Sequence, residues 1–184
     1  MPPTPPWLPA PLALACSDDC RSPECLRQTL AQFHVETDER YQPGSFGCPG
    51  TRCNFLTWDA TRAMECEIPH WVDNSGTGVK HHSRGAHELS AAGTIGWLRV
   101  FGSDHGWQSV SSPEARALAN KGRPVVATFE NPDPALSSHV AMLLPTSESE
   151  TEPRIAQAGA ANLFDVPLSR GFGRGKRIEF WAHD

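Results

Sequence analysis

The hydrophobic pattern changes along the 184-residue chain, from helix-like spacing in the first part to short apolar runs in the second. After Ser22-Pro23-Glu24, apolar residues recur every three to four positions from Leu26 to Phe33. A serine N-cap, a proline at the first helical position and an acid in the first turn are typical of a helix start. This segment therefore predicts a helix that packs one face on the body of the protein.

Three further helices are expected. Residues 53–65 contain neither glycine nor proline and mix apolar with charged positions, which favours a helix with Cys53 at or near its N-terminus. Residues 86–101 predict another, although two glycines inside this range lower its intrinsic helix stability. The last is expected over residues 112–122, where a Ser-Pro-Glu start is followed by a glycine in the C-cap region.

The second half of the chain predicts strands, because its short apolar runs are separated by turn residues. These runs cover residues 124–129, 139–144, 154–158 and 177–181. The acidic stretch 147–152 predicts a solvated hairpin tip between two of them. Since the helices precede the strands, the expected fold class is α+β with segregated layers. We expect a single domain over residues 22–184, preceded by a proline-rich arm over residues 1–21 that is extended or mobile.

Composition and charge narrow the class of protein. With 39% hydrophobic and 20% charged residues, the chain is expected to be globular rather than disordered. A formal net charge of -5 argues against a broad electrostatic grip on nucleic acid. Apolar runs long enough to span a bilayer are absent from the sequence, so no membrane partner is expected.

The start of the chain bears on export. Six prolines fall within the first eleven positions, and the segment from Leu12 to Cys16 is faintly similar to a lipobox. Because a basic n-region is missing and prolines interrupt the apolar part, we do not expect a cleaved signal. Six cysteines are many for a cytosolic domain of this size, and some could form disulfides outside the cytoplasm. The spacing leaves their connectivity open.

Candidate chemistry centres on Cys53 and His139. A cysteine nucleophile reacts as the thiolate, and the unpaired N–H groups at a helix N-terminus stabilise that anion. Cys53 stands where the second expected helix begins, and His139 opens an expected strand after a proline-rich turn. The imidazole at the strand edge could therefore face the helix terminus and act as general base.

The order of these residues resembles the NlpC/P60 and CHAP families, papain-like cysteine peptidases and amidases that cut peptidoglycan. The likeness is carried by three short segments (residues 51–55, 138–142 and 155–159) and spans residues 48–181. It implies a papain-like fold, with N-terminal helices packed on an antiparallel sheet. It also implies acyl transfer without a cofactor, with the stem peptides of peptidoglycan as the substrate class.

In these families a third polar residue on the next strand orients the imidazole. The resemblance assigns that role to Gln157, with Asn162 as the alternative. CHAP domains more often carry an acid at this point and a glycine before the histidine, where this chain has Ser138, so neither family is chosen over the other. Arg52, Trp71 and the pair His81-His82 are candidates for the walls of the cleft, on position alone.

Other readings of the same residues remain open. Four histidines and two cysteines that lie close in sequence suggest a zinc site, although none has a HExxH or paired CxxC spacing: His70, His81, His82, His87, Cys48 and Cys66. The spacing Cys16-x3-Cys20-x4-Cys25 is a looser metal candidate. A chelator would inactivate a zinc-dependent hydrolase and spare a thiol enzyme. A catalytically inert binding module would survive thiol alkylation.

Three features are expected to be structural rather than catalytic. Asp59 and Arg62 predict an exposed ion pair on one helix face. Four tryptophans are expected in or beside the core: Trp58, Trp97, Trp107 and Trp181. The glycine-rich residues 171–175 lack the Lys-Ser/Thr ending of a phosphate loop and predict a turn before the last strand.

The expected function is hydrolysis of an amide bond in peptidoglycan, in the bacterial periplasm or cell envelope. Without an export signal, such an enzyme fits an antibacterial effector that a secretion system delivers. An effector of this kind predicts a cognate immunity protein that plugs the cleft in the producing cell. A phage or housekeeping lysin is the alternative. The bond that is cut stays open, as does transacylase or deamidase chemistry with the same residues.

Overall fold

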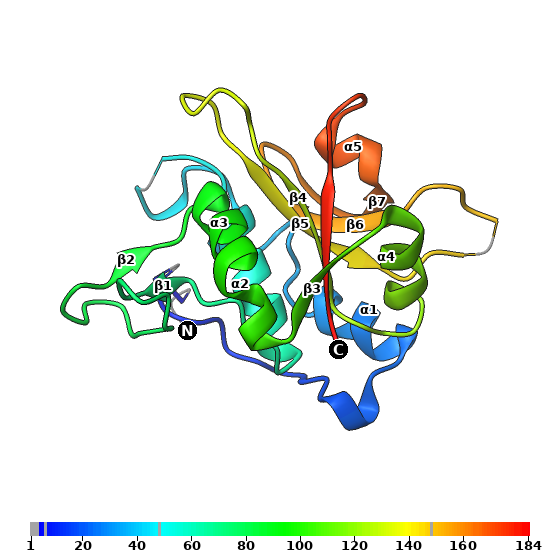
Figure 1. The fold of residues 1–184 in the computed structure, drawn as a ribbon, viewed down its shortest axis with the longest axis horizontal. Coiled ribbons are helices and arrows are strands. Elements are labelled where there is room, and N and C mark those ends of the chain that lie inside the picture. Colours follow the sequence, from blue (N-terminus) through cyan, green and yellow to red (C-terminus); the bar gives the residue numbers. More distant parts are fainter. Residues whose placement is uncertain (1–3, 6, 48, 148) are drawn as a thin grey trace.

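The computed structural model describes residues 4–5, 7–47, 49–147 and 149–184. Its centre is an antiparallel six-stranded sheet with the strand order β3-β8-β4-β5-β6-β7 (Figure 1). The strands are β3 (Trp107–Val110), β4 (Val125–Phe129), β5 (His139–Leu144), β6 (Arg154–Ala158), β7 (Asn162–Pro167) and β8 (Glu179–His183). A separate two-stranded ribbon pairs β1 (Trp71–Val72) with β2 (His87–Glu88). The chain is therefore a mixed α/β protein built on antiparallel sheets, as the expected α+β class requires.

Five helices surround the large sheet in the described part of the chain. They are α1 (Pro23–Ala31), α2 (Cys53–Ala63), α3 (Ala91–Phe101), α4 (Ser112–Ala119) and α5 (Leu168–Phe172). In Figure 1, α2 and α3 lie to the left of the sheet and α4 to its right. Both faces of the central strands are therefore covered, which is why every residue of β4 is buried and β5 is buried beyond its first residue.

Three helices start at a serine N-cap, of which the sequence predicted Ser22; α4 is capped by Ser111, and the expected Ser112 is its first helical residue. The side-chain oxygens of Ser22, Ser90 and Ser111 accept backbone N–H bonds in the first turns of α1, α3 and α4. The helix expected over residues 86–101 begins five residues later, at Ala91, because residues 87–88 form strand β2. The strand expected over residues 177–181 is shifted by two residues, to β8.

The sequence missed β3 and β7, which are the two edges of the sheet. An edge strand is covered on fewer sides, so it tolerates polar residues and loses the apolar signature of a strand. In β3 only Trp107 is buried, and the residues of β7 are half-buried or exposed. The sequence also missed the short helix α5. Its last two residues fall within the range 171–175, which predicts a turn.

Helix α2 is buried along almost its whole length, since it packs against β5 and β6 and also contacts α1 and α3. Two of its buried threonines donate hydrogen bonds within the helix. The Thr57 hydroxyl donates to the carbonyl of Cys53 at 3.0 Å, and the Thr61 hydroxyl to that of Thr57 at 2.8 Å. These bonds allow a helix of mixed composition to be placed in the core.

The exposed ion pair expected between Asp59 and Arg62 is wrong. Asp59 is fully buried and binds Arg40 (Nε to Oδ2, 2.7 Å) and the Tyr41 hydroxyl (2.9 Å). Arg62 instead donates to the carbonyl of Ala10. A buried carboxylate needs several donors, and the segment at residues 39–41 (η2, Glu39–Tyr41) supplies the two from Arg40 and Tyr41. Burial, with the charge of Asp59, raises the pKa of Tyr41, so its hydroxyl stays protonated as a donor.

The described part of the N-terminal arm lies extended against the domain. The backbone N–H of Ala10 donates to Asp59 Oδ1 at 2.9 Å, and the carbonyl of Pro5 accepts from Arg40 at 2.8 Å. Further along, Cys16 is buried, donates its N–H to the carbonyl of Ala63 at the end of α2, and is disulfide-bonded to Cys25 in α1. These contacts join the arm to α2 and to the Arg40 side chain that binds it.

Three of the four tryptophans expected in or beside the core are buried, and Trp181 is half-buried, as expected. None of the helices within the described residues has the length and apolar character needed to span a bilayer.

Removal of the buried carboxylate should destabilise the fold. In Asp59→Ala, Arg40 and Tyr41 keep their buried donors without an acceptor, so we expect a loss of about 3–5 kcal/mol in the free energy of unfolding. Urea unfolding followed by tryptophan fluorescence measures it. The exposed Asp104→Ala is the matched control and should change stability by less than about 0.5 kcal/mol. Equal effects of the two variants would contradict the role given to Asp59.

Candidate active site

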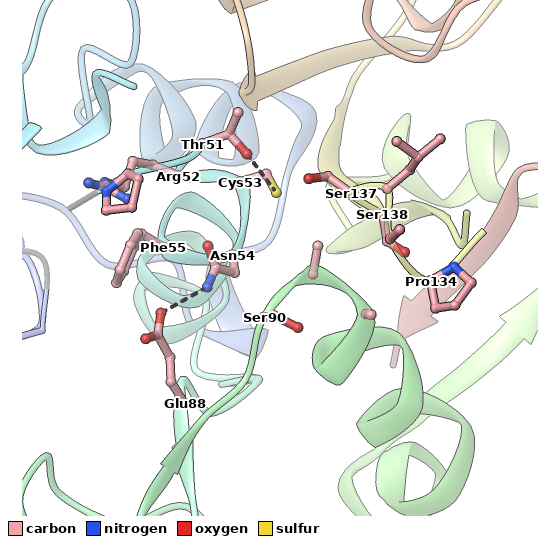
Figure 2. Close-up of a pocket in the computed structure, with 15 residues that line it drawn as sticks. Thr51, Arg52, Cys53, Asn54, Phe55, Glu88, Ser90, Pro134, Ser137 and Ser138 are labelled. Atoms are coloured by element: carbon pink, nitrogen blue, oxygen red, sulfur yellow. Dashed lines mark hydrogen bonds between the residues drawn. The ribbon is translucent and has the colours of Figure 1, made fainter. Parts of the chain in front are cut away.

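Cys53 is the first residue of α2, and its side chain is turned toward a pocket between α2, α3 and the β4–β5 loop (Figure 2). The residue is 3% exposed. The backbone N–H of Arg52 donates to the carbonyl of Ala158 at 3.2 Å, which ties the start of α2 to the end of β6. The Thr51 hydroxyl lies 4.0 Å from the sulfur. The helix start is thus fixed on the sheet, and the thiol lies at its amide end.

His139 is the first residue of β5 and is half-buried. Its imidazole and the backbone N–H of Val140 lie beside the Cys53 thiol, and both lower the pKa of that thiol. The ring packs against Phe172 of α5, with ring centroids 4.8 Å apart. Because β5 is central in the sheet and α5 covers the ring, the imidazole is held in one orientation.

The amide of Gln157 fixes the protonation of His139. Gln157 Nε2 donates to the carbonyl of Ala161 at 2.9 Å, so Oε1 is the atom that lies 2.8 Å from His139 Nε2. An amide oxygen only accepts hydrogen bonds, so the proton between these atoms belongs to Nε2 of the histidine. The Nδ1 atom is then left for the thiol, as a base when His139 is neutral and as a donor when it is charged.

The two titratable groups shift each other's pKa in opposite directions. Burial raises the pKa of the Cys53 thiol, but the hydrogen bond and charge of His139, with donors from Val140 and Thr51, outweigh it and lower the pKa below the ordinary value. Burial lowers the pKa of His139, and the bonds to Cys53 and Gln157 outweigh it and raise the pKa. Both shifts favour a thiolate beside an imidazolium.

Two glycines leave the space that Gln157 occupies. A Cβ added at Gly171, in α5, would lie 2.2 Å from Gln157 Oε1 and 2.5 Å from the Ile155 side chain. A Cβ at Gly159 would lie 3.0 Å from Gln157 Nε2. Gln157 itself is 4% exposed. The side chain that orients the histidine is therefore enclosed by backbone on two sides.

The pocket beside Cys53 has a volume of about 450 Å³. One wall is the loop between β4 and β5, where Pro134 to Ser138 line the space. Asn131 and Asp133 brace this loop: the N–H of Asn131 donates to the Ser138 hydroxyl at 3.1 Å, and the N–H of Ala135 to Asp133 Oδ1 at 2.9 Å. Leu136 is 59% exposed on the rim, where an apolar part of a ligand could pack.

The opposite wall carries an acid that the sequence did not reveal. Glu88 ends β2 and lines the pocket together with Asn54, the residue after the nucleophile (Figure 2). Asn54 Nδ2 donates to the carbonyl of Leu89 at 2.9 Å and reaches Glu88 Oε1 at 3.4 Å. The sequence around Glu88 has no apolar period, and it predicts one helix over residues 86–101. It therefore gives no signal that Glu88 lies in a separate short strand beside the pocket.

The structure brings together the three residues expected to carry the chemistry: Cys53, His139 and Gln157. The alternative third residue, Asn162, is turned away and donates to the carbonyl of Tyr41 at 2.9 Å. Of the positions expected to form the cleft walls, Arg52 lines the pocket. Trp71 lines a different cavity of about 370 Å³, and His81 and His82 are not among the described lining residues of either.

The zinc alternative based on histidines gains no support from the described residues. His70 is buried among aromatic rings, whereas His81, His82 and His87 are exposed or half-buried, and these residues form no ligand cluster with Cys66. Cys48 lies outside the described residues.

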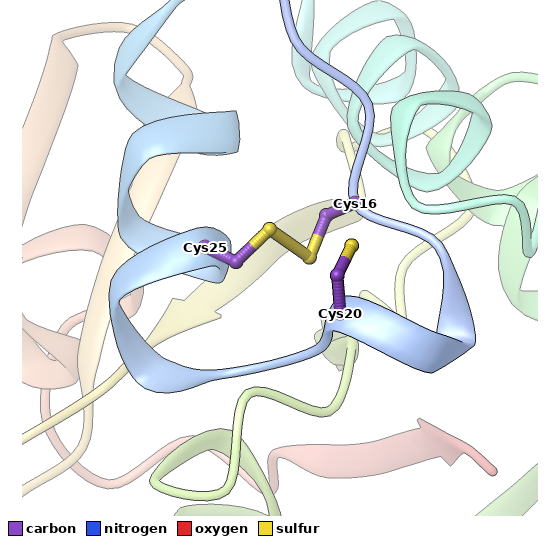
Figure 3. A group of neighbouring side chains, drawn as sticks. All are labelled: Cys16, Cys20 and Cys25. Atoms are coloured by element: carbon purple, nitrogen blue, oxygen red, sulfur yellow. A yellow bond between two sulfur atoms is a disulfide. The ribbon is translucent and has the colours of Figure 1, made fainter.

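The potential ligand cluster that the described residues contain is Cys16, Cys20 and Cys25, whose sulfurs lie within 4.8 Å of one another. Figure 3 shows that two of these sulfurs are joined in the Cys16–Cys25 disulfide, with Cys20 beside them as a free thiol. The disulfide occupies two sulfurs that a metal would need as thiolates. Among the described cysteines, the bridge joins Cys16 to Cys25, and Cys20, Cys53 and Cys66 are free.

Comparison with known proteins adds no name to this geometry. No protein-family model matches the chain, and no curated protein matches it. A function must therefore be inferred from the residues of the site and their geometry.

The coupling of Cys53 to His139 predicts a pH dependence. In the wild type, alkylation of Cys53 by iodoacetamide should have its midpoint at lower pH than in the urea-unfolded chain, because the folded thiol has the lower pKa. In His139→Ala burial is opposed by the Val140 and Thr51 donors without the imidazole, so the midpoint should move upward, and the rate at pH 7 should fall about ten-fold or more. Mass spectrometry of tryptic peptide 53–62, whose sole cysteine is Cys53, measures the rate. Asn162→Ala is the control and should leave the midpoint unchanged. A wild-type midpoint equal to that of the unfolded chain would contradict the coupled pair.

Filling the space at Gly171 should weaken the same pair. In Gly171→Ala the new methyl group displaces Gln157 Oε1, and His139 loses an acceptor worth about 1 kcal/mol, or roughly five-fold in the thiolate fraction at neutral pH. The alkylation profile of peptide 53–62 measures this change. Gly96→Ala, in α3, is the matched control, because a Cβ there meets no atom within 4 Å. Identical profiles for the two variants would show that Gln157 does not support the pair.

Proposed function

We propose that this protein is a papain-like cysteine hydrolase that cleaves an amide bond in peptidoglycan. The observation that supports it best is the placement of His139, oriented by Gln157, beside the thiol of Cys53, which starts a buried helix and lines a pocket. Opposed pKa shifts of a thiol and an imidazole in one pocket are what nucleophilic catalysis requires. A structural cysteine in the core needs neither the base nor the pocket.

The proposed first step is attack of the Cys53 thiolate on the substrate carbonyl carbon, with the C–O π electrons moving to oxygen. Cys53 is the first residue of α2, so its N–H has no acceptor within the helix and can donate to this oxyanion. The His139 imidazolium then protonates the leaving amine, the C–N bond breaks, and an acyl-thioester remains on Cys53. The lowered pKa of Cys53 increases the fraction of thiolate available for this step.

In the second step His139, now neutral, takes a proton from water while the hydroxide attacks the thioester carbonyl. The thiolate leaves, the carboxylic acid departs, and the imidazolium is restored. Gln157 accepts the Nε2–H bond in both protonation states of the ring, so it maintains the ring orientation throughout. As a neutral amide it orients the base without adding a negative charge to the pocket.

Peptidoglycan stem peptides are proposed as the substrate on the resemblance of three segments to the NlpC/P60 and CHAP families. In these segments Cys53, His139 and Gln157 are the matching positions, and they are also the three residues that meet in the site. Action in the bacterial envelope, as an antibacterial effector with an immunity partner or as a lysin, belongs to the same proposal.

Digestion of purified peptidoglycan tests the proposal. The wild type should release fragments whose masses identify the cleaved bond, and Cys53→Ala should lower the rate by at least about 10³-fold, because the nucleophile is lost. Mass spectrometry of the soluble products measures both. Cys20→Ala removes an exposed free cysteine outside the pocket and should retain full activity.

Each other outcome overturns part of the proposal. Equal release by the wild type and Cys53→Ala would remove Cys53 from the mechanism. No release by either protein, with Cys53 still alkylated at neutral pH, would leave a reactive thiol and reject peptidoglycan as the substrate.

A further inference from the structure

The pocket beside Cys53 contains a carboxylate that the proposed mechanism does not use. Glu88 lines the wall opposite the β4–β5 loop, and its side chain is 44% exposed (Figure 2). Its backbone is set by pairing of β2 with β1, where Glu88 lies opposite Trp71, and by the bond from Leu89 N–H to the carbonyl of His70 at 2.9 Å. The position of Glu88 is therefore set by tertiary contacts of its backbone.

One oxygen of the Glu88 carboxylate, Oε1, is contacted by two side chains. Asn54 Nδ2 lies 3.4 Å and His70 Nε2 lies 3.2 Å from Glu88 Oε1. His70 is 2% exposed, with its ring centroid 4.4 Å from that of Phe55 and 5.0 Å from that of Trp58. Its approach to Glu88 is close but poorly aligned for a hydrogen bond, so the contact is chiefly electrostatic. A buried imidazole in an aromatic setting thus fixes an acid at the pocket surface.

The surroundings of this acid keep it charged. Contact with His70, opposed by partial burial, lowers the pKa of Glu88, and Asn54 and the charge of Arg52 lower it further, so it is ionised at neutral pH. The cation among the described lining residues is Arg52, which is 3% exposed and donates to the carbonyl of Ser45 at 2.8 Å. Glu88 is the single acid among the described residues that line this pocket. A ligand there meets one exposed negative charge in addition to the thiolate.

We propose that Glu88 is a substrate-binding residue that selects a primary ammonium group on the acyl substrate held beside Cys53. This inference rests on the proposed hydrolase function and adds its specificity. The ammonium can be the N-terminal amine of a peptide or the side-chain amine of a diamino acid. His70 and Asn54 are positioning residues that act through Glu88.

Charged thiol reagents test the selection without any assumption about the natural substrate. The Cys53 thiolate attacks a methanethiosulfonate at its divalent sulfur, a disulfide forms and methanesulfinate leaves. The rate with the cationic 2-aminoethyl reagent is divided by the rate with the neutral methyl reagent, which cancels changes in thiol reactivity. Mass spectrometry of tryptic peptide 53–62 reports Cys53 alone.

In the wild type this ratio should exceed that of Glu88→Gln by about three-fold or more at low salt, and the difference should shrink as ionic strength rises. Glutamine keeps the oxygen that faces Asn54 and His70, so the variant removes charge and spares the contact. The exposed Glu114→Gln changes net charge equally outside the pocket and should leave the ratio at the wild-type value. Equal ratios for the wild type and Glu88→Gln would overturn the proposal, whatever the result with peptidoglycan.

Stem peptides acetylated in turn at the α-amine and at the side-chain amine distinguish the two sources of ammonium. One acetylation should lower the wild-type kcat/KM by about ten-fold, and Glu88→Gln should not respond to it. If neither acetylation changes the wild-type kcat/KM, the ammonium preference is wrong even where hydrolysis itself is observed. If no peptide is cleaved, the reagent ratio still decides the charge selection, and the hydrolase proposal fails separately.

Discussion

The pairing of the Cys53 thiol with the His139 imidazole is the interaction on which the rest of the site depends. A thiolate in a buried position is costly unless donors and a positive charge surround it. The imidazole and the Val140 N–H come from β5, and β6 provides the Gln157 oxygen that keeps the imidazole proton on Nε2. The pair can exist because the start of one helix is fixed against the ends of two neighbouring strands.

The position of the start of α2 depends on contacts made further along the same helix. Asp59, two turns beyond the nucleophile, is fully buried and joins the helix to Arg40, Tyr41 and the N-terminal arm. The arm is in turn fastened by the Cys16–Cys25 disulfide. A buried ionic network of this kind is weak as a source of net stability but is specific in geometry, because only one placement of the helix satisfies its groups. The N-terminus of α2, where Cys53 lies, is therefore positioned by contacts far from the pocket.

In the proposed function, reactivity and recognition come from different parts of the fold. The sheet and α2 hold the thiol, the base and the orienting amide, whereas the irregular region around the β1–β2 ribbon contributes Glu88, and the β4–β5 loop contributes the facing wall. A rigid catalytic frame surrounded by loops that shape the pocket allows the selected substrate to change without disturbing the chemistry. The buried His70 links the two parts, since it contacts Glu88 on one side and packs against Phe55 and Trp58 of α2 on the other.

The sequence by itself predicted the central strands, the helix start at Ser22, and the places of Cys53 and His139 at the starts of a helix and a strand, because apolar runs, a Ser-Pro-Glu start and a cysteine at a helix start are local signals. It did not determine the edge strands β3 and β7, whose polar residues carry no strand pattern. It misjudged Asp59 because helical spacing reports a neighbour such as Arg62 but not a partner on another element. Only the tertiary structure decided that Gln157 and not Asn162 faces His139, that Gly171 leaves room for it, and that Glu88 lies beside Cys53. Each of these depends on which distant segments meet, and that is set by packing rather than by any pattern within one segment.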